Sequence, residues 1–170
     1  MPEIEAKKVF RGVLNALAYC HSVGVSHGDL KAENILLRDS CEPVIIDFGF
    51  SMHGDSKVSL FRGTITYMAP EITLRKPYLG KCADVWALGV LLYFMLYGVT
   101  PFRGCSDTEI RGRIERGVYS VPKYVSSAAS AFLAKILVVD PESRATCQDL
   151  LNESWIQEAD RPKKSSFINI

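Results

Sequence analysis

The chain has 170 residues with a formal net charge of +1, and 48% of its residues are hydrophobic. This composition is typical of a soluble globular protein with one sizeable core, so we expect a single domain. The near-neutral charge gives no support for a general attraction to nucleic acid or to an anionic membrane. The five scattered cysteines contain no C-x-x-C pair, which favours reduced thiols in a cytoplasmic or nuclear protein over a disulfide framework or a zinc site.

The first part of the chain predicts a helix followed by a hairpin. Apolar residues recur at spacings of three and four across residues 5–22, which predicts an amphipathic helix. Residues 35–37 and 44–46 are short apolar runs separated by turn-forming residues, and this pattern predicts a small β-hairpin. The polar stretch 50–62 has no apolar period and predicts an exposed, mobile loop.

The second part of the chain predicts helices. Residues 83–96 are apolar on nearly every side, which predicts a helix buried in the core. Residues 106–116 predict a polar surface helix, and residues 126–138 and 146–153 predict two amphipathic ones. The longest apolar run, 85–97, is shorter than the roughly 20 residues that span a bilayer. A small membrane-associated protein is therefore a hypothesis that we rank far below a soluble, mainly α fold.

Charged and polar side chains gather in one segment, residues 27–34, which read H-G-D-L-K-A-E-N. Asp29, Lys31 and Asn34 stand there between two apolar runs, a pattern that indicates a loop between buried elements. A second carboxylate, Asp47, follows the second predicted strand. Carboxylate and amide oxygens on adjoining loops are suitable ligands for Mg²⁺.

These segments resemble the motifs of protein kinases. H-G-D-L-K-A-E-N is similar to the kinase catalytic loop, with Gly28 in place of the usual arginine, and D-F-G is intact at 47–49. A-P-E at 69–71 and D-V-W-A-L-G at 84–89 follow in the family's order, and Arg144 stands where an arginine pairs with the A-P-E glutamate. The resemblance implies a serine/threonine-type kinase and the helical C-terminal lobe of its fold.

The resemblance assigns chemical roles to a small set of residues. Asp29 would accept the proton of the substrate hydroxyl, Lys31 would neutralise the transferring phosphate, and Thr64 would hydrogen-bond near Asp29. Asn34 and Asp47 would bind Mg²⁺ and, through it, ATP. Outside this family context, each of these side chains would be interpreted as a turn-forming or surface residue.

Other residues receive structural roles from the resemblance: His27, Phe48, Gly49, Glu71, Asp84 and Arg144. His27 and Phe48 would stack in a spine of side chains that stands on Asp84. Glu71 and Arg144 would form a buried ion pair that fixes the end of the activation segment, the stretch from D-F-G at 47–49 to A-P-E at 69–71. Such pairs serve geometry more reliably than net stability.

The sequence departs from the family in what precedes the catalytic loop. Only 26 residues come before His27, and no G-x-G-x-x-G occurs. The chain therefore resembles the large lobe alone, over residues 1–156, followed by a tail at 157–170 whose basic stretch 161–166 we interpret as solvated. Because ATP lies between the two lobes of a kinase, we expect the isolated chain to bind nucleotide weakly and to be inactive. A protein partner could cover the exposed lobe interface.

A second departure is Gly28. The arginine that stands there in the family receives a phosphate on the activation loop, so its absence argues against regulation of this kind. Ser59 remains the candidate phosphorylation site. An arginine introduced at position 28 is predicted to make activity sensitive to charge at Ser59.

Two classes of function follow. The first is a serine/threonine kinase that phosphorylates a protein substrate with ATP and Mg²⁺, and the second is a non-catalytic, pseudokinase-like binding module. Neither involves nucleic acid or a membrane. Y-C-H at 19–21, D-F-G-F-S at 47–51 and W-I-Q at 155–157 are similar to the calcium/calmodulin-dependent group, and within it to the testis-specific serine kinases.

Overall fold

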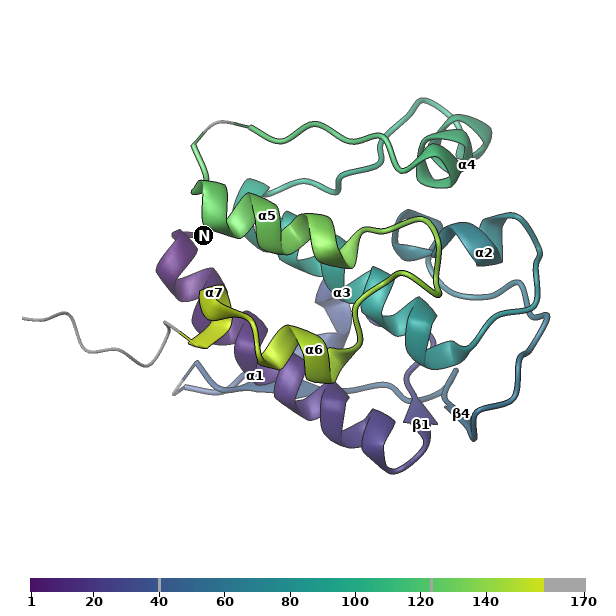
Figure 1. Cartoon of the computed structure of the whole chain (residues 1–170), viewed down its shortest axis with the longest axis horizontal. Helices are drawn as coiled ribbons and strands as arrows, with labels where there is room; N and C mark the ends of the chain where they lie inside the picture. Colours follow the sequence, from purple (N-terminus) through teal and green to yellow (C-terminus); the bar gives the residue numbers. More distant parts are fainter. Residues whose placement is uncertain (40, 123, 158–170) are drawn as a thin grey trace, which may run out of the picture.

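The computed structural model describes residues 1–39, 41–122 and 124–157, and helices make up most of this part of the chain (Figure 1). The helices are α1 (Glu3–Ser22), α2 (Pro70–Thr73), α3 (Gly80–Tyr97), α4 (Asp107–Arg116), α5 (Ser127–Ile136), α6 (Cys147–Leu151) and α7 (Ser154–Gln157). Helix α3 packs against both α1 and α5, α6 packs along α1, and α4 packs against α2. The basic stretch 161–166 lies outside the described residues.

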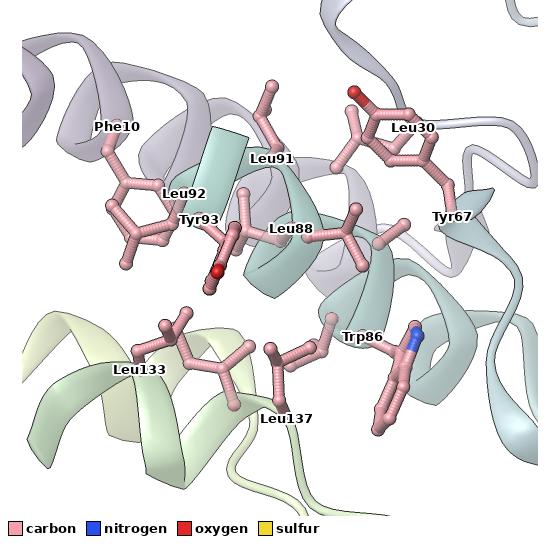
Figure 2. Close-up of a cluster of buried hydrophobic side chains, with 14 of the residues drawn as sticks. Phe10, Leu30, Tyr67, Trp86, Leu88, Leu91, Leu92, Tyr93, Leu133 and Leu137 are labelled. Atoms are coloured by element: carbon pink, nitrogen blue, oxygen red, sulfur yellow. The ribbon is translucent and has the colours of Figure 1, made fainter. Parts of the chain in front are cut away.

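Helix α3 is the centre of the core. Its Trp86, Leu88 and Leu92 are fully buried, and Figure 2 shows Leu133 and Leu137 facing this helix from the α5 side. By length and composition α3 could cross a membrane, but 78% of it is buried inside the protein. That burial is what a core helix requires, because a helix apolar all round must be covered on every side.

The predicted hairpin is present beside the 27–34 loop. Strand β2 (Ile35–Leu37) pairs antiparallel with β3 (Pro43–Ile45), and Ile35 lies opposite Ile45. The second strand begins and ends one residue earlier than predicted. Its first residue is Pro43, which has no N–H to donate and is tolerated at the end of a ladder. The expected mainly α fold with one small hairpin is confirmed.

Residues 50–62 are predicted to form an exposed, mobile loop; most of them are exposed, but the segment also contains paired backbone. Strand β4 (Met52–His53) pairs antiparallel with β1 (Val25–Ser26), and an isolated bridge joins Val58 to Tyr78. Each of these strands has only two residues, which is too short for a periodic apolar pattern, and its partner lies far away in the sequence. The loop is therefore tied to the segments on both sides of it.

Several helix boundaries differ from those predicted. Helix α3 begins three residues earlier, at Gly80, because Cys82 and Ala83 already donate backbone hydrogen bonds to Leu79 O. Helix α6 ends at Leu151, and α7 follows as a separate element that the sequence did not predict. The predicted cap at Thr146 is confirmed, since its side chain and Asp149 form a capping box. All five cysteines are free.

Candidate active site

The 27–34 loop is anchored to the core helix through one carboxylate. Asp84, on α3, accepts hydrogen bonds from the backbone N–H groups of His27 at 2.7 Å and Gly28 at 2.9 Å. His21 Nε2 contacts the same carboxylate at 2.9 Å. His21 belongs to the Y-C-H segment at 19–21, but the sequence does not predict its contact with Asp84. Asp84 thus fixes the start of the loop from inside the protein.

His27 connects three parts of the site. Its Nδ1 accepts the backbone N–H of Asp29 at 3.2 Å, and its Nε2 donates to Ile46 O at 2.9 Å. The ring also meets Phe48 edge-on, with centroids 4.7 Å apart, although Phe48 itself is 39% exposed. Because both ring nitrogens are engaged, the geometry supports a structural role for this histidine rather than proton transfer.

Asp29, Lys31 and Thr64 form one compact group. Asp29 Oδ1 accepts from Thr64 N at 3.0 Å and from Thr64 Oγ1 at 3.1 Å, while Lys31 Nζ donates to Asp29 Oδ2 at 2.6 Å. Lys31 Nζ also reaches Thr64 Oγ1 at 3.1 Å. The hydrogen bond to Asp29 raises the pKa of Lys31 above its ordinary value, against the opposing effect of burial. The group therefore holds an oriented carboxylate next to a cation.

Asn34 and Asp47 lie at the adjoining edge of the hairpin. Asn34 Nδ2 donates to Asp29 O at 2.8 Å, which leaves the amide oxygen as the atom that could ligate a metal. Asp47 is exposed, has a positive φ of 61°, and accepts the N–H of Gly49 at 3.2 Å. The backbone links them indirectly, because Ile46 N donates to Asn34 O.

The donor set fits Mg²⁺ but does not complete its coordination shell. The two side chains offer an amide and a carboxylate oxygen, which are hard ligands of the kind this ion prefers. In the part of the chain that the structure describes, no cluster of three or more His, Cys, Asp or Glu side chains could hold a metal. Further ligands would have to come from water and phosphate, as is usual for Mg²⁺.

Gly28 is a position where an arginine does not fit, contrary to the expectation that one could simply be restored. Its φ is +83°, and an added Cβ would come within 2.4 Å of the carbonyl oxygen of Phe50. That carbonyl instead accepts Arg62 Nη2 at 2.7 Å. Arg62, which the sequence did not point to, therefore supplies the positive charge next to the loop from the activation segment itself.

A buried ion pair fixes the far end of that segment. Arg144 Nη1 and Nη2 donate to the two carboxylate oxygens of Glu71 at 2.8 and 2.9 Å. Arg144 also donates to the carbonyls of Cys82, Val138 and Val139. The pair thereby joins α2 to α3 and to the segment before α6, in the arrangement that the resemblance implied.

These features are those of a kinase large lobe, and the comparison with known families agrees. The protein kinase domain profile matches residues 1–156, so the chain belongs to the protein kinase domain family.

Similar proteins include two from Mus musculus. The chain is 41% identical over 162 residues to putative sperm motility kinase W, and 38% identical over 160 residues to sperm motility kinase 3A. These alignments cover 94% and 93% of the chain and 32% of each relative. It is also 38% identical over 158 residues to the probable serine/threonine-protein kinase MARK-A of Dictyostelium discoideum, covering 92% of the chain and 15% of that protein. The chain thus spans a third or less of the length of these relatives.

Proposed function

We propose that the chain forms the substrate-binding side of a serine/threonine protein kinase, which transfers a phosphoryl group from ATP to a protein hydroxyl. The observation that carries the proposal is the group of Asp29, Lys31 and Thr64. Phosphoryl transfer needs positioning and charge more than covalent chemistry, and this group supplies both at one point.

Each side chain has a defined part in this proposal. Asp29 orients the substrate hydroxyl and accepts its proton, while Thr64 keeps the carboxylate in place. Lys31 lies beside that carboxylate, where its ammonium group can neutralise charge on the transferring phosphate. Asn34 and Asp47 would hold Mg²⁺, which bridges the phosphates of the nucleotide when it is bound.

The activity of the 170 residues by themselves is a separate question. In a kinase the nucleotide is covered by a glycine-rich loop and contacted by a lysine on a strand, and the present sequence contains no G-x-G-x-x-G. We propose that the isolated chain is inactive and that ATP and Mg²⁺ act in a protein that also contains a small lobe. The free cysteines support a cytoplasmic or nuclear setting.

A non-catalytic binding module is the second candidate, and an exposed apolar face favours it. Leu36, Leu37, Phe48 and Phe50 are all exposed, and each lies within three positions of Asn34 or Asp47 in the sequence. A small lobe would cover this face in a kinase, and a protein partner could cover it in a binding module. Exposed apolar patches of this kind mark surfaces that another domain or another protein covers.

Within the family, we propose that the chain is related to the calcium/calmodulin-dependent group, and within that group to the testis-specific serine kinases. The support is in the sequence: Y-C-H at 19–21, D-F-G-F-S at 47–51 and W-I-Q at 155–157. Two of these segments lie at the site, since His21 contacts Asp84 and Phe50 accepts Arg62.

A chimera tests the catalytic proposal. The small lobe of sperm motility kinase 3A is fused upstream of Met1, and transfer of labelled phosphate from ATP to a serine peptide is measured. We expect turnover in the parent, and loss of turnover with retained MgATP binding in Asp29→Asn. Asp39→Asn, in the exposed hairpin turn, is the matched control and should keep full turnover. Full turnover in Asp29→Asn would contradict the assignment.

A further inference from the structure

A cavity separate from the Asp29 site lies where the end of α4 approaches the segment that follows α3. Its volume is about 250 Å³, and three arginines line it: Arg103, Arg113 and Arg116. Tyr93 and Tyr119 complete its wall. This is a local concentration of positive charge in a chain whose net charge is only +1. From the sequence alone, this region predicts only a polar surface helix over residues 106–116.

Within the described residues, most of this positive charge is not neutralised by an acidic side chain. Arg113 Nη2 contacts Glu109 Oε1 at 2.7 Å, but both side chains are more than 40% exposed, at 46% and 41%, so the pair is screened by water. In residues 1–39, 41–122 and 124–157, no ion pair engages Arg103 or Arg116. Two guanidinium groups are therefore available to an anion at one cavity.

The helix dipole explains only part of the cluster. Arg113 and Arg116 stand in the last turn of α4, where cations stabilise the negative end of a helix. Arg103 comes from a different segment, three residues before Ser106 caps the start of α4, and gains nothing from the C-terminal end of the helix. Its convergence on the same cavity needs another explanation.

Two tyrosines of the cavity wall are packed against core residues. Tyr93 belongs to the core helix α3, is buried, and donates its hydroxyl to Ser120 O at 2.8 Å. Tyr119 packs edge-on against Tyr93 and against Phe102, with centroids 5.9 Å apart in both cases. The tyrosine side of the hollow is therefore in place before a ligand binds, so binding needs to order only the arginine side chains.

We propose that this cavity binds the phosphorylated side chain of a protein segment, such as a phosphoserine. Guanidinium groups present paired N–H donors that match phosphate oxygens, and phosphate carries the two negative charges that two free arginines can compensate. The proposal concerns a surface away from the Asp29 site, and it holds whether or not the chain transfers phosphate.

The surroundings favour a protein segment over a membrane surface. Val118 lines the cavity and is exposed, and the exposed Val121 and Tyr124 follow it in the chain, so apolar residues that flank a phosphoserine would find contacts. Asp107 and Glu109 lie on α4 itself and would repel a broad anionic surface. A single phosphate group on a peptide can enter the cavity, which neither of these two carboxylates lines.

Fluorescence polarisation on the full chain tests this proposal. The probe is a short labelled peptide with one phosphoserine, compared with its unphosphorylated twin at low salt. We expect the phosphopeptide to bind about tenfold more tightly or better, and the double variant Arg103→Gln with Arg116→Gln to lose at least about tenfold of that affinity. Arg38→Gln, an exposed arginine in the hairpin turn, is the matched control and should bind as the parent does.

Further measurements identify the ligand and the place where it binds. In amide NMR spectra, we expect the phosphopeptide to move the signals of Tyr119 and Ser120 in the parent and not in the double variant. Equal affinity for the two peptides, or an unchanged double variant, would overturn the proposal. So would inorganic phosphate binding as tightly as the phosphopeptide, or binding to phosphatidylserine vesicles without binding to the phosphopeptide. Circular dichroism checks that the double variant is folded.

Discussion

The two carboxylates of the candidate active site are held in very different ways. Asp29 is buried and accepts hydrogen bonds from Thr64 and Lys31, and its loop is tied to Asp84 in the core. Asp47 is exposed, and the only hydrogen bond to its side chain within the described residues comes from Gly49, two positions away. The Asp29 side of the candidate site is thus held by the described residues themselves, whereas the Asp47 side is open.

This difference has a simple physical origin. The side-chain contacts of Asp29 come from Thr64 and from Lys31 of its own loop, and Asp84 of the core helix anchors the start of that loop. Phe48 and Phe50, which flank Asp47, are large apolar side chains that remain exposed. A nucleotide site at that edge would need further protein above it to exclude water and strengthen the electrostatic interactions.

We expect the largest loss of stability from breaking the Glu71–Arg144 ion pair, which fixes the end of the activation segment. Arg144→Ala leaves Glu71 as a buried charge without its partner, and we expect a loss of about 3–5 kcal/mol in the free energy of unfolding. Urea titration followed by circular dichroism measures it. Arg38→Ala removes an exposed pair with Glu42 and should cost only about 0–1 kcal/mol. Equal midpoints for the two variants would show that the buried pair does not hold the segment.

A smaller effect should come from the start of the catalytic loop. Gly28→Ala imposes a left-handed conformation on alanine, at roughly 1–2 kcal/mol, and forces its Cβ against Phe50 O, which adds about 1–3 kcal/mol. Gly98→Ala is the control, because Gly98 also has a positive φ, of 73°, but has nothing within 4 Å of the added Cβ. Equal losses of stability in the two variants would mean that the close approach of Phe50 is unimportant.

The smallest effect compares the two carboxylates directly. Asp29→Asn places an amide donor among the donors of Thr64 and Lys31, and we expect a cost of about 1–3 kcal/mol. Asp47→Asn changes an exposed side chain and should stay within about 0.5 kcal/mol of the parent. Thermal melts of both variants measure the contrast, and a larger loss for Asp47→Asn would reverse the comparison.

Sequence reasoning recovered the helical framework because its signals are local. The apolar periodicity predicted α1, and the continuous apolar run predicted α3, although three residues of its first turn were missed. The site residues were assigned by resemblance, and the structure places Asp29, Lys31 and Thr64 in contact across 35 positions of sequence. No periodic pattern could have supplied that contact.

What the sequence did not reveal depends on long-range geometry. The pairing of β1 with β4 involves two residues on each strand, and His21 meets Asp84 across 63 positions. Gly28 was recognised as a missing arginine, but the carbonyl of Phe50 that excludes a side chain there could be seen only in three dimensions. The same is true of the arginine-lined cavity, since Arg103 and Arg116 lie on different segments.

Calorimetric titration of the purified, folded 170-residue chain with MgATP measures whether the lobe binds nucleotide without further protein. We expect no saturation below about 1 mM, equivalent to about −4 kcal/mol, because Asn34 and Asp47 alone can neither cover nor neutralise the phosphates. Micromolar affinity that disappears in Asp47→Asn would contradict this expectation. That result would show that the large lobe alone builds a complete nucleotide site.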